Sequence, residues 1–580
     1  MRKDNVISES ALTIAKDRYF FENEDTWEEC STRVGNFVAD VENGDRKFYG
    51  DKFSEVIYNM EFLPGGRILR NAKRHSGSMF NCYVLPIGDS IEEIGQFMKD
   101  ALILWSEGGG VGTNLSYLRP RGASIKGKGG SSSGPVSFLE AADGIASTIE
   151  SGGSRRAAGL ACMNVEHPDI QEFVDSKMVH GILSYFNISV GVTDEFLDAV
   201  ESDKDWTFKF NRQDYGKVSA RDIWNKVIEN MIKHAEPGLL NFSNLMSNNS
   251  YYFDPIYSTN PCGEATLSPY ESCDLGSLVL PRFITGSINT NWKKLEETTR
   301  LAVRFLDDVI DCNKYVLKEI DIKSHNNRRI GLGVMGLAEY LFAKKLRYGS
   351  PKAIAEVEKL MKFIKETAYD ESINLAVEKG AFPKFDPVAY GKAHFIRSLP
   401  ASLRMKIKEH GCRNVSLMSI APTGTISLIP EVSSGIEPLF RKAYKRSDRV
   451  SDRIYVHPLY RTLIENKDNG EDIVDWFVDS GDLKPEDHLE VQSVVQRHVD
   501  GAVSKTINMP KGSTTEELSK LLLEYIHDLK GVTVYVDGSR EGQILNHITE
   551  EEVVDYLKNE TEGVGYDMEN GGCSTGKCDI

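Results

Sequence analysis

Asn260-Pro261-Cys262-Gly263-Glu264 is the stretch of sequence on which the interpretation of this chain depends. A proline and a glycine on either side of a cysteine favour a tight, non-repetitive loop, which can hold one thiol at a defined point. Asn260 and Glu264 each lie two residues from Cys262, so in an extended loop both could lie on the same side as the thiol. An amide, a carboxylate and a thiol could form a catalytic group, although a small buried cysteine in a turn has the same local sequence.

Four other cysteines extend this pattern along the chain. Cys273 follows Cys262 closely, Cys82 opens an apolar run far upstream, and Cys573 and Cys578 lie in a Gly-rich segment at the end of the sequence. A four-thiolate zinc site would need a second closely spaced pair, which the sequence lacks, so we predict no metal site. A dithiol in a mobile tail suits disulfide exchange better, because exchange needs an accessible thiolate.

Composition and charge exclude several classes of protein. The 580 residues are 40% hydrophobic and 27% charged, which is typical of a compact globular protein. A formal net charge of -17 disfavours direct nucleic-acid binding, but small nucleotide phosphates remain possible ligands. The sequence has neither a secretory signal nor an apolar run of membrane-spanning length, and nine cysteines do not suggest a secreted disulfide framework. We therefore expect a cytoplasmic protein without a membrane partner.

The periodicity of apolar residues predicts an α/β protein. Residues 1–80 have helical spacing, and from residue 81 short apolar runs, at 82–87, 186–192 and 415–420, alternate with amphipathic stretches. One such stretch, residues 295–310, predicts a helix with an apolar stripe that packs on the core. A capping box at Thr514 and Glu517 predicts a helix that Gly531 ends, followed by a strand over 532–536. The polar, Gly-rich segment from residue 559 predicts a mobile tail.

Specific motifs, far apart but in a fixed order, identify a family. The sequence resembles the catalytic chain of ribonucleotide reductases, most closely the cobalamin-dependent class. The resemblance implies a ten-stranded α/β barrel with a central finger loop over residues 81–558, a small helical region without an ATP cone over 1–80, and a redox tail over 559–580. The motifs are Phe62-Leu63-Pro64-Gly65-Gly66-Arg67, Asn81-Cys82, Gly152-Gly153-Ser154-Arg155-Arg156, residues 260–264, Ala421-Pro422-Thr423-Gly424-Thr425, and Gly531-Val532-Thr533-Val534-Tyr535 leading to Asp537-Gly538-Ser539.

The same resemblance implies a role for each of these thiols. Cys262 would form the thiyl radical that takes a hydrogen from C3′ of the ribose, with Glu264 as general base and Asn260 as a hydrogen-bond donor beside it. Cys82 and Cys273 would supply two electrons and form a disulfide. Cys573 and Cys578 would reduce that disulfide, and thioredoxin or glutaredoxin would reset the tail. We assign Cys30, Cys162, Cys312 and Cys412 to packing.

Substrate and effector sites also follow from the resemblance. The run from Pro422 to Ser427 has the composition of a helix N-terminus that binds phosphate, and the glycines after Ser106 indicate a loop near the substrate. The resemblance favours ribonucleoside diphosphates as substrates, dNTPs and ATP as specificity effectors, and a homodimer. The predicted substrate residues are Ser106, Gly109, Gly110, Asn260, Pro422, Thr423, Gly424, Thr425 and Ser427. The predicted effector residues are Asp89, Ser90, Lys126, Arg155 and Arg156, with specificity loops over 127–134 and 152–162.

The source of the radical separates the classes of the family. Chains that receive it from a metal-containing subunit carry a C-terminal tyrosine pair, whereas Val536 follows Tyr535 here, and Tyr251-Tyr252 lies before the finger loop. The segment at 563–566 resembles a glycyl-radical loop but lacks the expected arginine. We therefore predict adenosylcobalamin as cofactor. The alternatives are the large subunit of a two-subunit reductase and an inactive nucleotide sensor.

Overall fold

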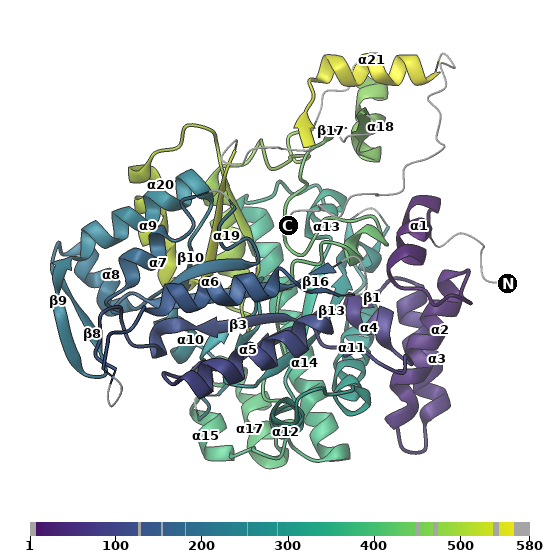
Figure 1. Cartoon of the computed structure of the whole chain (residues 1–580). Coiled ribbons are helices and arrows are strands. Elements are labelled where there is room, and N and C mark those ends of the chain that lie inside the picture. Colours follow the sequence, from purple (N-terminus) through teal and green to yellow (C-terminus); the bar gives the residue numbers. More distant parts are fainter. Residues whose placement is uncertain are drawn as a thin grey trace.

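A computed structural model describes residues 7–125, 129–151, 155–179, 181–251, 253–286, 288–447, 452–467, 474–537 and 545–561 (Figure 1). Its N-terminal part is helical: Thr26 and Glu29 form a capping box at the start of α2, and Val34, Val38, Phe53 and Ile57 fill the contact between α2 and α3. One short strand, β1 (Phe62–Pro64), leaves this region and pairs with the central sheet. The helices are α1 (Glu9–Arg18), α2 (Trp27–Val38), α3 (Arg46–Tyr58) and α4 (Gly66–Asn71).

Two sets of parallel strands form the body of the molecule. The first half-barrel contains β2 (Cys82–Val84), β3 (Gly110–Asn114), β6 (Ala158–Asn164), β7 (Phe186–Val192) and β10 (Gly238–Asn241). The second contains β13 (Ser272–Val279), β16 (Ile330–Met335), residues 416–420, β19 (Thr506–Met509) and β20 (Gly531–Val536). Residues 416–420 join through isolated bridges, Leu332 to Met418 and Ile420 to Val503, rather than as a regular strand.

The two half-barrels meet in antiparallel seams, β2 with β13 and β10 with β20. These seams close the ring, so the predicted ten-stranded α/β barrel is confirmed. Because the halves run in opposite directions, the starts of the first five strands and the ends of the second five lie at one end of the barrel, which we call the mouth.

Helices cover the outside of the barrel. The predicted amphipathic helix is present as α11 (Trp292–Cys312), with Leu295, Phe305 and Ile310 buried. The predicted capping box begins α20 (Thr515–Tyr525), but the prediction that Gly531 ends this helix is wrong, because Gly531 is the first residue of β20. The other helices are α5 (Ile91–Ser106), α6 (Pro135–Ala146), α7 (Ile170–Asp175), α8 (Asp194–Glu201), α9 (Ala220–His234), α10 (Phe242–Ser247), α12 (Lys318–Asn327), α13 (Leu337–Ala343), α14 (Pro351–Lys379), α15 (Pro387–Lys392), α16 (His394–Arg397), α17 (Ala401–His410) and α19 (Pro485–Gln496).

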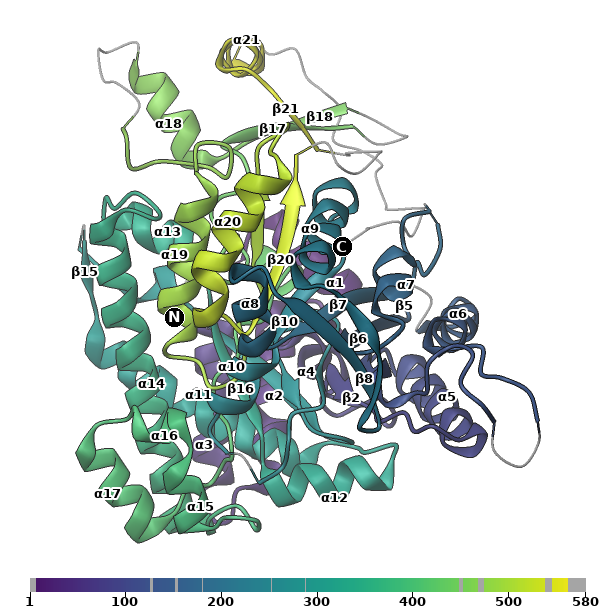
Figure 2. The same ribbon diagram turned by 90° about the vertical axis from the view of Figure 1, so that its left-hand side faces the viewer.

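A small group of elements lies outside the barrel sheet, beyond the mouth. Strands β17 (Ala443–Ser447), β18 (Asp452–Val456) and β21 (Leu545–His547) form their own sheet, beside α18 (Pro458–Lys467) and α21 (Glu550–Thr561). Figures 1 and 2 both show this group at one end of the molecule, and in Figure 2 the arrow of β20 points toward it. None of the helices in the described ranges combines the length and apolar character that a membrane crossing needs.

Candidate active site

A short hairpin inside the barrel carries the central motif. Its strands are β11 (Ser258–Thr259) and β12 (Thr266–Leu267), and we call residues 258–267 the finger. The predicted extended loop is instead a turn at the tip, closed by a hydrogen bond from the Gly263 N–H to the Asn260 carbonyl at 3.0 Å. Gly263 has a φ of 81°, a conformation that glycine adopts without strain. The turn leaves Cys262 exposed and buries Asn260 and Glu264.

The first half-barrel holds one side of the finger. The backbone carbonyl of Thr259 passes so close to β3 that a Cβ at Gly112 would lie 1.7 Å from it, so this position accepts only glycine without a shift. Farther along, the Asn187 side chain at the start of β7 donates to the Pro261 carbonyl at 3.2 Å. Close approach of the backbones therefore fixes the distance between the finger and the barrel wall.

The second half-barrel holds the other side. The backbone carbonyl of Glu264 accepts hydrogen bonds from the Ser419 hydroxyl and the Ala502 N–H, both at 2.9 Å. The sequence analysis missed Ser419, Ala502 and Asn187, and no local signal marks them, because each contacts only a main-chain oxygen of a distant segment. The finger is thus anchored to both half-barrels.

Cys82 and Cys273 lie directly opposite each other across the seam between β2 and β13. Opposed residues of an antiparallel pair have Cα atoms about 4.5–5.5 Å apart and point their side chains to the same face. That separation lies inside the range that a disulfide spans. Both cysteines are buried thiols, and they belong to one cluster with Ala265 and Leu267 of the finger.

Asn260 and Glu264 contact the thiol of Cys82. The Asn260 side-chain amide donates to Cys82 Sγ at 3.2 Å, and Cys82 Sγ lies 3.6 Å from Glu264 Oε1. The second oxygen of this carboxyl, Oε2, has no hydrogen-bond partner within the described part of the chain. Burial raises the pKa of Glu264, although hydrogen bonds from Asn260 and Cys82 partly oppose the shift. The site therefore contains a buried carboxyl group whose proton affinity is raised and one of whose oxygens has no hydrogen-bond partner among the described residues.

The electrostatics of the site keep its internal cysteines in the thiol form. Burial raises the pKa of Cys82 and Cys273 well above the ordinary value. The neighbouring charges of Glu264, beside Cys82, and Asp274, beside Cys273, raise it further. Neutral thiols are poor nucleophiles, but they carry the hydrogen atoms and electrons that a two-electron reduction consumes. The exposed Cys262 lies at the tip of the same finger, so three thiols and one carboxyl group share one site.

Three thiols grouped around a finger inside a ten-stranded barrel match the arrangement that the sequence resemblance implies. The family model "Ribonucleotide reductase, barrel domain" matches residues 80–535, and the model "Ribonucleotide reductase, all-alpha domain" matches residues 6–77. The chain belongs to the ribonucleotide reductase family.

Named relatives of this reductase family support the same grouping. The chain is 35% identical to the vitamin B12-dependent ribonucleoside-diphosphate reductase of Mycobacterium tuberculosis, over all of this chain and 84% of that protein. It is 36% identical to the protein of the same name from Thermoplasma acidophilum, over 92% of this chain and 72% of that protein. Identity to the ribonucleoside-diphosphate reductase subunit alpha of Chlamydia muridarum is 27%, over 74% of this chain and 47% of that subunit.

The predicted phosphate loop of the reductase follows residues 416–420 at the mouth of the barrel. The prediction of a helix N-terminus is wrong, because only a 3₁₀ turn, Ile426–Leu428, follows the loop. Thr423 has a φ of 51°, and its hydroxyl accepts a hydrogen bond from the Gly435 N–H at 2.8 Å. Ser427 is buried and contacts the Ser434 hydroxyl at 3.1 Å, whereas Pro422 and Gly424 are exposed and Thr425 is half-buried. The exposed part of this loop is the part that a ligand can reach.

The other predicted substrate residues lie at the start of β3. A Cβ at Gly110 would lie 2.9 Å from Pro261 of the finger, so Gly110 faces the finger directly. A Cβ at Gly109 would lie 2.5 Å from the Tyr83 ring. Ser106, at the end of α5, is exposed and donates to the Ile103 carbonyl at 2.7 Å. The structure therefore brings the glycines, but not the Ser106 hydroxyl, into contact with the finger and its surroundings.

Two of the predicted effector residues, Asp89 and Ser90, lie at the start of α5. The Asp89 carboxylate binds the Arg119 guanidinium at 2.9 Å, and Ser90 is the N-cap of α5. Arg155 and Arg156 form the short strand β5, and Lys126 lies outside the described residues. Cys573 and Cys578 also lie outside the described residues.

Proposed function

We propose that this protein reduces ribonucleoside diphosphates to deoxyribonucleoside diphosphates for DNA synthesis, using adenosylcobalamin as its radical source. The observation that carries the proposal is the Cys82–Cys273 pair, opposed across the barrel seam next to the finger that bears Cys262. The names of the Mycobacterium tuberculosis and Thermoplasma acidophilum relatives support both the diphosphate substrate and the cofactor.

Each residue of the site has a defined part in this reaction. A sulfur radical at Cys262 takes the hydrogen atom from C3′, and Glu264 accepts the proton of the 3′-hydroxyl while Asn260 orients the same region. The 2′-hydroxyl then leaves as water. Cys82 and Cys273 together give two electrons and two protons and become a disulfide. Glu264 returns its proton to the 3′-oxygen, and Cys262 returns its hydrogen atom to C3′. The raised pKa of Glu264 suits proton transfer near neutral pH.

We propose that the cofactor binds inside the barrel, on the side of Cys262 where β20 runs. The inner face of β20 carries the exposed Thr533 and the half-buried Tyr535, while Val532, Val534 and Val536 are buried on the face that α9 covers. When bound, adenosylcobalamin supplies the radical chemistry that starts the reaction. We expect Thr533 and Tyr535 to face it. Val536 occupies the place of the second tyrosine of a relay, which disfavours a separate radical-generating subunit.

The experiment that tests this function uses the purified chain alone. We expect it to convert ribonucleoside diphosphates to deoxyribonucleoside diphosphates when only adenosylcobalamin and dithiothreitol are added. Activity that requires a metal-containing partner subunit would assign the chain to the two-subunit class instead. Binding of nucleotides without turnover under either condition would favour the nucleotide sensor.

We also propose that residues 81–558 form the catalytic unit and that Cys573 and Cys578 in the tail, residues 559–580, regenerate the internal thiols. Cys82 and Cys273 are buried, so a small dithiol can reach their disulfide but thioredoxin or glutaredoxin cannot. The double variant Cys573→Ser, Cys578→Ser should therefore keep its activity with dithiothreitol and lose multiple turnover with thioredoxin. Equal rates with thioredoxin for the variant and the natural chain would rule out the relay.

We also propose that specificity effectors bind around Asp89 and Ser90, with Lys126, Arg155 and Arg156 contributing to the site. The chain then forms a homodimer through α5. The exposed Ile91 in the first turn of α5, with 68% of its surface accessible, supports a contact there. Nucleotide-dependent association in analytical ultracentrifugation would test both points, because an Ile91→Asp variant should stay monomeric.

A further inference from the structure

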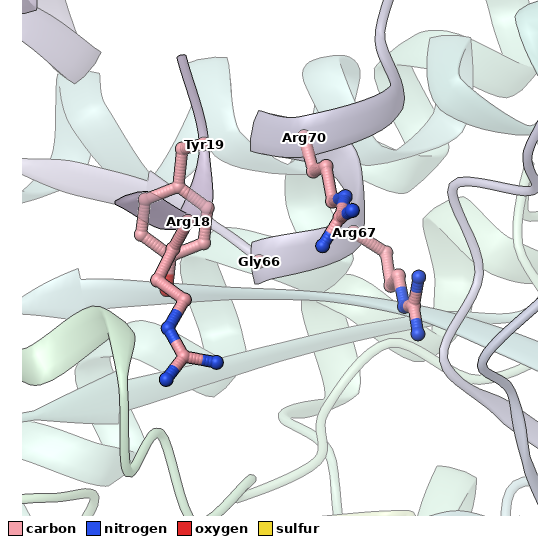
Figure 3. Close-up of a pocket in the computed structure, with 5 residues that line it drawn as sticks. All are labelled: Arg18, Tyr19, Gly66, Arg67 and Arg70. Atoms are coloured by element: carbon pink, nitrogen blue, oxygen red, sulfur yellow. The ribbon is translucent and has the colours of Figure 1, made fainter. Parts of the chain in front are cut away.

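Several cationic side chains have no part in the mechanism above, and they differ in burial. Arg18, Arg67 and Arg70 line a pocket beside α4 (Figure 3), but its volume of about 10 Å³ is no more than one water molecule needs. Lys530, directly before β20, is fully buried instead. A buried ammonium group costs free energy unless its N–H groups find acceptors, so the acceptors of Lys530 show which part of the structure it stabilises.

The Lys530 side chain crosses the seam between the two half-barrels. Its Nζ donates to the carbonyls of Asp500 at 2.7 Å and Gly501 at 2.9 Å, both in the second half-barrel. Its own carbonyl accepts a hydrogen bond from the Asn241 N–H of β10, in the first half-barrel, at 3.0 Å. Lys530 therefore ties residues 500–502, which we call the wall segment, to the opposite half of the barrel.

The wall segment is in direct contact with the backbone of the finger. The Ala502 N–H donates to the Glu264 carbonyl at 2.9 Å. A Cβ at Gly501 would lie 3.2 Å from the same oxygen and 2.6 Å from the Met418 carbonyl, so the backbones here are packed without room for a side chain. A displacement of Gly501 must therefore move the Ala502 N–H, and with it the residue that carries the carboxyl group of the site.

Other contacts hold the wall segment from the opposite side. The Asp500 carboxylate accepts hydrogen bonds from two backbone N–H groups of residues 416–420, at 2.7 and 2.9 Å, and from the Tyr369 hydroxyl at 2.6 Å. The Gln496 side chain shares one of the two carbonyls with Lys530, at 3.1 Å. Gln496 is a neutral donor, and a charged donor forms a hydrogen bond roughly twice as strong. Lys530 is therefore the stronger of the two restraints on these carbonyls.

We propose that Lys530 is a positioning residue for Glu264. Its two hydrogen bonds hold the wall segment in the arrangement in which the Ala502 N–H fixes the finger, and this sets where the Glu264 carboxyl group meets the substrate. Lys530 itself is buried behind the wall and acts only through it. The kinetic consequence rests on the proposed function, in which Glu264 accepts a proton, whereas the link between Lys530 and the finger can be measured without substrate.

The charge of Lys530 gives this link a pH dependence. Burial lowers the pKa of Lys530 to about 7, while the Asp500 carboxylate opposes that shift and the Arg329 guanidinium adds to it. The contacts from β10 and α19 are backbone and amide groups, which do not titrate. The protonated form donates more strongly than the neutral amine. We therefore expect kcat to fall to a lower plateau as pH rises through about 7.

Lys530→Met removes both donors at similar side-chain volume, and two measurements follow its effect. In hydrogen exchange on the full chain without nucleotide, the Ala502 amide should exchange about tenfold faster relative to Ala161 of β6, because the wall segment has lost its charged restraint. With adenosylcobalamin and dithiothreitol, kcat should fall about 10–100-fold at nearly constant KM, and the decrease near pH 7 should disappear. Lys530→Gln, which keeps two neutral N–H donors, should recover part of kcat but not the pH dependence.

Lys505→Met is the matched control, because Lys505 is also a buried lysine of the second half-barrel but donates to Glu437 and His488 instead of the wall segment. It should keep the natural exchange ratio and the decrease in kcat near pH 7. An unchanged exchange ratio in Lys530→Met, or an unchanged kcat, would overturn the positioning role and leave the proposed function intact.

Two further outcomes are separable from these. If Lys530→Met does not fold, the same measurements on Lys530→Gln decide the question, with a smaller rise in the exchange ratio expected and no rise overturning the proposal. If the natural chain shows no turnover, the proposed function fails, and the exchange ratio alone decides whether Lys530 holds the finger.

Discussion

Two buried cysteines in the first half-barrel, Cys82 on β2 and Cys162 on β6, differ only in what surrounds them. Burial raises the pKa of both, to about 12 for Cys162 and well above the ordinary value for Cys82. Both also contact the finger, since Cys162 lies 3.4 Å from the Ser258 hydroxyl at its base. Only Cys82, however, has a second cysteine opposite it and the tip residues Asn260 and Glu264 beside it. Burial and pKa therefore do not distinguish the proposed redox thiol Cys82 from Cys162, whereas strand register does.

The largest effect should come from the tip of the finger. Cys262→Ser should lower turnover by about 10³-fold or more, because a hydroxyl cannot replace the thiol in hydrogen-atom transfer. Cys162→Ser, at the base of the same finger, should keep most of the activity and cost roughly 1–2 kcal/mol of stability. Rates of deoxynucleotide formation and thermal melting check both variants. A comparable loss of activity in the two variants would mean that turnover is sensitive to any change in a thiol that belongs to the finger or contacts it.

Changing the seam should separate electron supply from radical formation. Cys82→Ser and Cys273→Ser should each stop multiple turnover with dithiothreitol as well as with thioredoxin, a loss of about 10²-fold or more, because the two electrons must come from inside the site. Counting oxidisable thiols after one round of substrate, with and without reductant, measures the pair directly. If Cys162→Ser reduced the number of oxidisable thiols by the same amount, Cys162 would also supply electrons, and the distinction drawn here between the cysteines of β2 and β6 would be wrong.

The carboxyl group of the finger should set the pH dependence. Burial raises the pKa of Glu264, so the carboxylate form that accepts a proton is lost as pH falls through a value above the ordinary 4.5. Activity should therefore rise with pH along an acidic limb, and Glu264→Gln should remove that limb and lower kcat by about 10²–10⁴-fold. Glu166→Gln, a half-buried position just after β6, should leave the profile unchanged. If the acidic limb persisted in Glu264→Gln, the ionisation that causes it would belong to a group other than Glu264.

The smallest effect should come from the wall behind the finger. Gly112→Ala would place a methyl group against the Thr259 carbonyl, so the finger must shift, which should lower stability by ~1–3 kcal/mol and kcat by up to about 10²-fold. Gly391→Ala in α15 meets no atom within 4 Å and should be neutral or slightly stabilising. Melting curves and steady-state rates measure the difference between the two glycines.

Elements with a clear local pattern could be predicted from the sequence. The apolar run at 186–192 is β7, the strand at 532–536 is β20, and the amphipathic stretch around 295–310 is α11. The barrel as a whole followed from the resemblance rather than from periodicity, because buried strands and buried helices have similar apolar runs. The thiol grouping followed from the same resemblance, since nothing local joins Cys82 to Cys273.

Long-range contacts explain where local signals failed. Gly531 is typical of a helix end, but α20 ends at Tyr525 and a 3₁₀ turn intervenes, so the glycine is free to begin β20 beside β10. The predicted helix after Thr425 is reduced to one turn because the Thr423 hydroxyl binds the Gly435 N–H, which holds the chain in another path. Neither partner is recognisable from its neighbours in the sequence.

Anchoring the finger to both half-barrels makes its backbone a reporter of barrel opening. The Ala502 N–H of the second half-barrel donates to the Glu264 carbonyl, and Gly112 of the first half-barrel lies directly against the Thr259 carbonyl. The finger therefore cannot move away unless the two half-barrels separate. Amide protons of Gly263, Ala265 and Ala502 should therefore exchange with deuterium only as slowly as the barrel opens as a whole. In exchange experiments on the intact chain, the loop that carries Cys262 should behave like core, in contrast to the usual rapid exchange of loops.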